Sequence, residues 1–149
     1  MGWANWPARL QQLHDGPLFE MLPGGSELWI DGGHNPSAAR LIASHARKSW
    51  RDELPLVLLF ASLVTKDAAG VLSPFRGIAT EVLTLPIDGH ECRSPEDLAS
   101  LASSQGFASS PHRGLADALV AVEKPSRILI FGSLYLAGEA LSLNGTIPD

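Results

Sequence analysis

Short apolar runs alternate with amphipathic segments along this chain, and this alternation limits the possible folds more than any other feature. Apolar runs of about four to eight residues are typical of strands that are covered on both faces by helices. The sequence predicts four such strands, at 27–31, 54–62, 81–87 and 127–133. The pattern therefore indicates an α/β domain of the Rossmann-like, three-layer type, with a mostly parallel sheet.

Helix-start signals lie between the predicted strands. Asn35 can cap a helix that begins at Pro36, and Ser94 can cap another that begins at Pro95 and ends before Gly106. Further helices are predicted near 67–75, 113–123 and 134–143, with a short extended piece near 107–110.

Length and charge restrict the class of protein. The 149 residues suffice for one domain with a hydrophobic core and are too few for two ordinary domains. The formal charge of -5 and the pI near 5.4 disfavour a general nucleic-acid binder, because such proteins need a basic face. A small nucleotide remains compatible with this charge, since a few local cations can hold its phosphates.

The chain carries no sign of export or of membrane insertion. Cys92 is its only cysteine, so an internal disulfide cannot form. No apolar run approaches the roughly 20 residues that span a bilayer, and the first residues lack the regions of a signal peptide. These features predict a cytoplasmic protein.

Chemistry-bearing residues follow each predicted strand. Asp31-Gly-Gly-His34, the segment 62–67, the segment 88–93 and Gly132-Ser133 all stand at carboxyl ends, where open α/β sheets bind ligands. If the strands are parallel, these groups converge on one edge. The helix that begins at Pro36 would direct its free N–H groups at an anion there.

Each candidate also has an ordinary structural role. Asp31 can close a turn, and His34 can be a turn residue. Lys66 can belong to a solvated helix start, and Ser133 can cap the last helix. Arg93 can lie beside an acidic helix turn, and Arg9 can be a surface cation. The remaining histidines lack metal-ligand spacing, so no metal site is predicted.

Three familiar signatures are missing. No Gly-x-Ser-x-Gly elbow of hydrolases is present, and no Gly-x-Gly-x-x-Gly follows the first strand. None of Lys48, Lys66 and Lys124 ends a phosphate-binding P-loop. Whatever phosphate chemistry this chain takes part in, it lacks the usual cradle for phosphate.

Four segments, taken in order, resemble the C-terminal domain of folylpolyglutamate synthase/dihydrofolate synthase, within the Mur ligase superfamily. They are WPARLQQL, LWIDGGHNPSAARLIA, LLFASLVTKDAAGVL and ILIFGSLYLAGEAL. The resemblance runs from about residue 6 to 143, and its most specific part matches the family's Asp-Gly-Ala-His-Asn-Pro. It implies a connection to the preceding domain at 1–10 and a Mur ligase C-terminal-like domain at 11–149.

The reaction that this resemblance implies has three substrates. ATP phosphorylates the carboxylate of a folate or of dihydropteroate, and the amino group of L-glutamate then attacks the acyl phosphate. The P-loop, the Mg²⁺ ligands and most of the folate pocket are expected on an N-terminal domain that this chain does not contain. The isolated 149-residue chain is therefore predicted to be inactive.

The resemblance also implies residue roles. Arg9 matches the arginine of the interdomain motif and would bind ATP phosphate, for which a guanidinium with several donors is suited. Asp31 matches an aspartate that contacts the nucleotide in the family. Lys66 resembles the basic residue of the loop that faces the terminal phosphate of ATP. His34 and Ser133 match positions that line the cleft for glutamate and the acyl phosphate.

Arg93 would grip the amino-acid carboxylate, as an arginine before a helix-capping serine does in related Mur ligases. A carboxylate held in this way would orient the attacking amine.

Departures from the family pattern leave alternatives open. Ala8 replaces a glycine, Gly33 replaces an alanine and is expected to loosen its loop, and residues 14–25 are expected to form a hairpin. The alternatives are a Mur-type ligase adding an amino acid to a peptidoglycan precursor, and an α/β binding module without catalysis.

Overall fold

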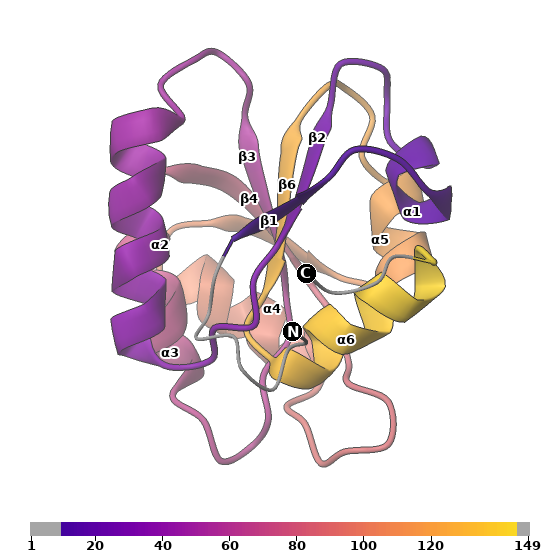
Figure 1. The fold of residues 1–149 in the computed structure, drawn as a ribbon. Coiled ribbons are helices and arrows are strands. Elements are labelled where there is room, and N and C mark those ends of the chain that lie inside the picture. The colour runs from indigo at the N-terminus through magenta and orange to yellow at the C-terminus, as the bar shows by residue number, and fades with distance from the viewer. Residues whose placement is uncertain (1–9, 146–149) are drawn as a thin grey trace.

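The computed structural model describes residues 10–145 and contains a six-stranded sheet between two layers of helices (Figure 1). The connection expected at 1–10 lies almost wholly outside the described residues. The strands are β1 (Gln11–Leu13), β2 (Glu27–Ile30), β3 (Leu56–Phe60), β4 (Ala79–Thr84), β5 (Ala108–Pro111) and β6 (Arg127–Phe131). The helices are α1 (Pro17–Glu20), α2 (Pro36–Ser49), α3 (Ala68–Leu72), α4 (Pro95–Ser104), α5 (Leu115–Val120), α6 (Leu134–Leu143) and the 3-10 turn η2 (Ser73–Phe75).

The strand order in the sheet is β1-β2-β6-β3-β4-β5. The last five of these strands are parallel, and β1 alone pairs antiparallel, with Gln11 opposite Ile30 and Leu13 opposite Leu28. The predicted α/β class with a mostly parallel sheet is therefore confirmed. The two buried strands β3 and β6 have no exposed residue, as their unbroken apolar runs predict.

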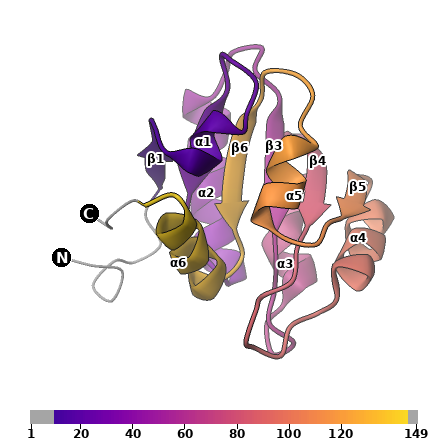
Figure 2. The ribbon, with the colours of Figure 1, turned by 90° about the vertical axis from the view of Figure 1, so that its right-hand side faces the viewer.

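Two hydrophobic clusters form the core, one on each face of the sheet. Alternate residues of β3 divide between them: Leu56, Leu58 and Phe60 face α2, α3 and α4, while Val57 and Leu59 face α1, α5 and α6. Figure 2 shows α1, α5 and α6 in front of the sheet, with α2 and α3 behind it. This arrangement is the predicted three-layer architecture.

The predicted helix caps are present. The side chain of Asn35 accepts a hydrogen bond from the amide of Ala38, and Ser94 accepts one from Asp97. Gly106 ends the α4 segment with a φ of 97°. The predicted elements exist, although most strands and the fourth and fifth helices are shorter than expected.

The hairpin prediction for residues 14–25 is wrong. This segment contains the single helical turn α1 and connects β1 to β2, which themselves form the antiparallel pair. A three-residue strand and a four-residue helix are too short to show a period in the sequence. Their positions depend on pairing with β2 and on packing against α6.

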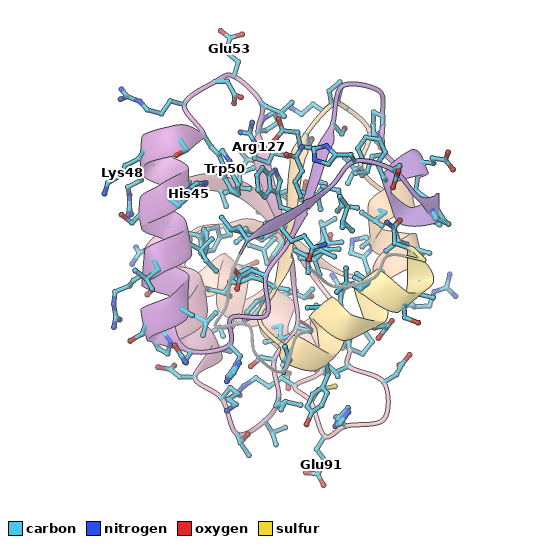
Figure 3. All side chains as sticks on the ribbon, in the orientation of Figure 1. His45, Lys48, Trp50, Glu53, Glu91 and Arg127 are labelled. Carbon is cyan, nitrogen blue, oxygen red and sulfur yellow. The ribbon has the colours of Figure 1, made fainter. Side chains whose placement is uncertain are left out.

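A buried arginine stabilises the edge of the sheet at which the parallel strands begin. Arg127, only 3% exposed, pairs with Glu27 at 2.8 Å and with Asp52 at 2.8 Å, and its guanidinium lies 5.1 Å from the ring of Trp50. Figure 3 shows Arg127 and Trp50 near one end of the sheet and Glu91 beyond the other. This network ties the segment after α2 to β2 and β6.

Candidate functional site

The segments that follow β2, β3 and β6 meet at the carboxyl edge of the sheet, as parallel strands require. A cavity of about 160 Å³ opens between them. It is lined by His34, Leu63, Lys66, Gly132, Ser133, Leu134 and Tyr135. Three side chains that the sequence singled out, from three different loops, thus share one small cavity.

Asp31 lies outside this lining. Its residue is 0% exposed, and its Oδ1 accepts a hydrogen bond of 2.6 Å from the Gly33 amide. The other oxygen, Oδ2, is buried and accepts no hydrogen bond from the described residues. Burial raises the pKa of Asp31 to about 6, and the hydrogen bond from Gly33 opposes this shift. The closing of a turn, which the sequence offered as the ordinary role of Asp31, is present.

The glycine loop after β2 is tightly packed. A Cβ on Gly33 would lie 2.9 Å from Oδ1 of Asp31 and 3.0 Å from Cβ of Ala38 in α2. The Gly33 carbonyl accepts a 2.9 Å hydrogen bond from the Gly132 amide. The expectation that Gly33 loosens the loop is therefore wrong, because the glycine allows a close approach of carboxylate, loop and helix.

His34 is half-buried at the end of this loop. Its Nδ1 lies 3.3 Å from the Gly32 carbonyl oxygen. If Nδ1 carries the proton, it donates to that carbonyl and leaves Nε2 as an acceptor, while a protonated ring offers two donors. The next residue, Asn35, caps α2 by accepting a hydrogen bond from the Ala38 amide, so this helix begins directly after the residue that lines the cavity.

Ser133 has the structural role foreseen as its alternative. Its Oγ accepts hydrogen bonds from the amides of Tyr135 at 3.1 Å and Leu136 at 3.4 Å, and so caps α6. The residue is only 2% exposed. It contributes to the cavity by fixing the start of α6, whose positive helix end adjoins the ligand space.

Lys66 and Arg93 come from neighbouring loops that are tied together. Lys66 lines the cavity, whereas Arg93 is exposed and outside its lining. The Arg93 guanidinium donates to the Lys66 carbonyl at 3.3 Å, and its amide donates to the Ser62 carbonyl at 2.9 Å. The structure thus places Arg93 beside the Lys66 loop without bringing it into the cavity.

Tyr135 was missed by the sequence reasoning. It lines the cavity, is 51% exposed, and stacks on the ring of His90 with centroids 3.8 Å apart and planes at 17°. A signal was available, because Tyr135 stands in the first turn of a helix that begins directly after a carboxyl strand end. His90, expected to be structural or exposed, holds the 88–93 loop against this ring.

Arg9 lies outside the described residues, so its expected contact with phosphate has no geometry here. Within residues 10–145 no group of three or more His, Cys, Asp or Glu side chains could hold a metal ion. The side chains that line the cavity offer an imidazole, an ammonium and two hydroxyls, and no carboxylate. This donor set does not suit Mg²⁺, which prefers oxygen ligands. No helix in the same range is long and apolar enough to cross a membrane.

The site is suited to an anionic group. Lys66, His34 and the start of α6 line the cavity and present positive charge or hydrogen-bond donors to it. Its 160 Å³ is below the roughly 300–1,000 Å³ of ordinary small-molecule pockets. It can therefore surround a carboxylate or one phosphate, and a larger ligand would extend beyond this chain.

A larger hollow lies at the opposite edge of the sheet. It measures about 620 Å³ and is lined in part by Glu81, Glu123 and Lys124. It includes none of the residues that the sequence singled out. The volume of a hollow alone therefore does not identify the candidate functional site.

No protein-family model matches the sequence. The folylpolyglutamate synthase of Lacticaseibacillus casei is 28% identical over 135 residues, which are 90% of this chain and 28% of that protein. The dihydrofolate synthetase of Saccharomyces cerevisiae is 26% identical over 155 residues, which are 95% of this chain and 36% of that protein. Over most of its length, the chain is similar to folylpolyglutamate and dihydrofolate synthases.

The fold of this chain matches that of a solved synthase structure. Mycobacterium tuberculosis folylpolyglutamate synthase, complexed with ADP and AMPPCP, superposes with a TM-score of 0.77 at 22% identity. The match covers 97% of this chain and 34% of that one. The chain thus spans about a third of the length of these synthases and has the fold of their C-terminal domain.

Proposed function

We propose that this chain is the C-terminal domain of an ATP-dependent ligase that adds L-glutamate to a folate or to dihydropteroate. The observation that carries the proposal is the similarity to folylpolyglutamate and dihydrofolate synthases over 90% and 95% of the chain. The cationic cavity at the carboxyl edge supports it, because an acyl phosphate and a glutamate carboxylate are both anions.

The proposed reaction needs a second domain. It would supply the P-loop, the Mg²⁺ ligands and most of the folate pocket, which fits the absence of a P-loop lysine and of carboxylates from the cavity. The chain would act as one side of a cleft between the two domains, in the cytoplasm. Alone, it would bind at most a fragment of the substrates.

We assign the following roles to the residues that the sequence singled out. Lys66 would neutralise the terminal phosphate of ATP or the acyl phosphate, acting as a point charge from the cavity wall. His34 would accept a hydrogen bond from the incoming amine, or donate one to an anion. Ser133 would hold the start of α6 toward the same anion. Arg93, at the neighbouring loop, would bind the glutamate carboxylate, and Arg9 would bind ATP phosphate.

The test replaces the matching domain of the Lacticaseibacillus casei synthase with this chain. Glutamate transfer is measured with ATP, labelled L-glutamate, and tetrahydrofolate or dihydropteroate. We expect ATP-dependent addition of glutamate by the chimera and none by the 149-residue chain alone. Transfer by the chain alone, or by a folded chimera only to a peptidoglycan precursor, would refute the proposal. So would a folded chimera that binds the substrates without turnover, which is the result expected for a non-catalytic module.

Matched variants test the site within this chimera. Lys66→Met and His34→Ala should reduce turnover by about 100- to 1,000-fold, the range for loss of a positioned charge or hydrogen-bond donor. Lys124→Met and His14→Ala alter the same residue types at the opposite edge of the sheet and should leave the rate unchanged. Equal effects of the two pairs would contradict this placement of the site.

A further inference from the structure

Ser110, His112 and Asp117 form a chain of hydrogen bonds at the edge strand β5. Oγ of Ser110 lies 2.9 Å from Nε2 of His112, and Nδ1 of His112 lies 3.3 Å from Oδ2 of Asp117. None of the three lines the cavity of the candidate functional site, and β3 and β4 separate β5 from β6. A hydroxyl, an imidazole and a carboxylate joined in this order are the parts of a nucleophilic centre, which is recognised by geometry and not by sequence position.

The register of β5 brings these side chains together. Successive residues of a strand point to opposite faces of the sheet, so Ser109 and Ser110 have different partners. Oγ of Ser109 donates to the Ala99 carbonyl in α4 at 2.7 Å, whereas Oγ of Ser110 contacts His112 on the other face. The His112 amide donates to the Thr84 carbonyl at 2.9 Å. This bond fixes the backbone of the imidazole residue to β4.

The hydrogen bonds determine which nitrogen of His112 can act as a base. An ionised carboxylate only accepts hydrogen bonds, so Nδ1 of the neutral ring directs its proton at Asp117, and Nε2 accepts from Ser110. Asp117 also accepts from the Arg113 amide at 3.1 Å, and this bond is the main cause that lowers the pKa of Asp117 below its ordinary value of 3.8. Asp117 is therefore ionised near neutral pH and holds the ring in the tautomer that can take the serine proton.

A hollow of about 460 Å³ adjoins this chain of hydrogen bonds. It is lined by Pro86, Pro95, Glu96, Pro111, His112, Arg113 and Asp117. The volume lies within the roughly 300–1,000 Å³ of small-molecule pockets, and the three proline rings make part of its wall apolar. Arg113, whose side chain is 94% exposed, can stabilise an oxyanion there, while Glu96 favours a neutral ligand over an anionic one.

We propose that Ser110, His112 and Asp117 form a second catalytic site, which hydrolyses small neutral carboxylic esters through an acyl-serine. Ser110 passes its hydroxyl proton to Nε2 of His112 while Oγ bonds to the ester carbonyl carbon. The bond from that carbon to the alcohol oxygen breaks, and the alcohol leaves with the proton from Nε2. Water then gives a proton to Nε2 and bonds to the acyl carbon. Ser110 regains the proton as the carboxylic acid is released.

Covalent labelling of the 149-residue chain tests the nucleophile. A fluorophosphonate phosphonylates an activated serine and releases fluoride, and peptide mass spectrometry locates the label. We expect one label per chain, on Ser110, and none in Ser110→Ala. Ser109→Ala is the matched control, because it removes the neighbouring hydroxyl on the opposite face and should label as wild type does. An unlabelled wild-type chain, or a label that survives Ser110→Ala, would overturn the proposal.

Hydrolysis of p-nitrophenyl acetate tests the base and the residue that orients it. After subtraction of the rate of Ser110→Ala, His112→Gln should lower turnover by about 100- to 10,000-fold. Asp117→Asn should have a comparable effect, because an asparagine permits the tautomer with the proton on Nε2. It keeps an acceptor for the Arg113 amide, so the fold should be retained, which urea unfolding checks. Turnover of folded Asp117→Asn within about twofold of wild type would refute the proposed chain of proton transfer.

This activity goes beyond the ligase reaction proposed above and does not depend on it. The labelling and the ester assay use the isolated chain, whereas glutamate transfer needs the chimera. A chimera without ligase turnover would therefore leave the ester site standing, and an unreactive Ser110 would leave the proposed ligase function standing.

Discussion

The backbone amide of Gly132 donates a hydrogen bond of 2.9 Å to the carbonyl oxygen of Gly33. The two residues follow the adjacent parallel strands β6 and β2, and the bond continues their ladder beyond the last paired residues. His34 and Ser133, the next residue on each side, both line the cavity. The contact between the two glycines therefore joins the two walls of the candidate site.

Gly132→Ala should strongly destabilise the fold. Gly132 has a φ of 106°, which costs a residue with a Cβ about 1–2 kcal/mol, and its Cβ would also lie 2.7 Å from the Phe60 ring. Overpacking of this kind adds about 1–3 kcal/mol. The free energy of unfolding in urea should fall by the sum of the backbone and overpacking costs. Gly106→Ala, with a φ of 97° and no atom within 4 Å of the new Cβ, should lose the backbone part alone. Equal losses of unfolding free energy in Gly132→Ala and Gly106→Ala would show that the protein relieves the contact between the new Cβ and the Phe60 ring.

Arg127→Met should cost about 1.5–3 kcal/mol, because it removes charge-assisted hydrogen bonds to the partly exposed Glu27 and the contact with Trp50. The free energy of unfolding at neutral pH measures this loss. Arg113→Met is the control, since that side chain is 94% exposed and its pair with Asp117 is 3.8 Å long. A loss below about 1 kcal/mol for Arg127→Met would mean that the network contributes nothing.

The same network should give acid sensitivity. The hydrogen bonds from Arg127 lower the pKa of Glu27 and of Asp52 below their ordinary values of 4.5 and 3.8. Their stabilisation is therefore complete above those values and is lost as the pH falls through the lowered ones. Wild-type protein should lose stability on acidification below about pH 4.5 more steeply than Arg127→Met. If the unfolding free energies of wild type and Arg127→Met fell equally with decreasing pH, this prediction would be contradicted.

Asp31→Asn should stabilise the protein increasingly as the pH rises. Because burial raises the pKa of Asp31 from 3.8 to about 6, the folded state holds its proton more tightly, and wild-type stability falls as the pH rises through this window. The effect is on the order of 3 kcal/mol. The difference in unfolding free energy between variant and wild type should grow by this amount from about pH 4 to about pH 7. A constant difference would show that Asp31 titrates normally.

Ser133→Ala should cost about 1–2 kcal/mol, because two amides at the start of α6 lose their acceptor. Ser94→Ala removes a similar cap from α4 and serves as the control. Both should lower the melting temperature, but Ser133→Ala alone should reduce turnover of the chimera. If Ser94→Ala reduces turnover equally, the effect is one of stability and Ser133 has no part in the site.

Much of the fold could be predicted because its determinants are local. The apolar runs of β3 and β6 indicate buried strands, and Asn35-Pro36 and Ser94-Pro95 mark helix starts through their own side-chain and ring chemistry. The strand β1 could not be predicted, since three residues carry no period and its place depends on pairing with β2. Because β1 has no recognisable pattern in the sequence, residues 14–25 were wrongly expected to form a hairpin.

The sequence by itself determined the α/β class and the placing of His34, Lys66 and Ser133 at one edge, because parallel strands bring their carboxyl ends together wherever they stand in the sheet. Only the tertiary structure decided that β6 lies between β2 and β3, which joins Gly132 to Gly33, buries Asp31 and brings Arg127 to Glu27. These contacts link residues about a hundred positions apart. They depend on strand order and side-chain packing, which no local pattern records.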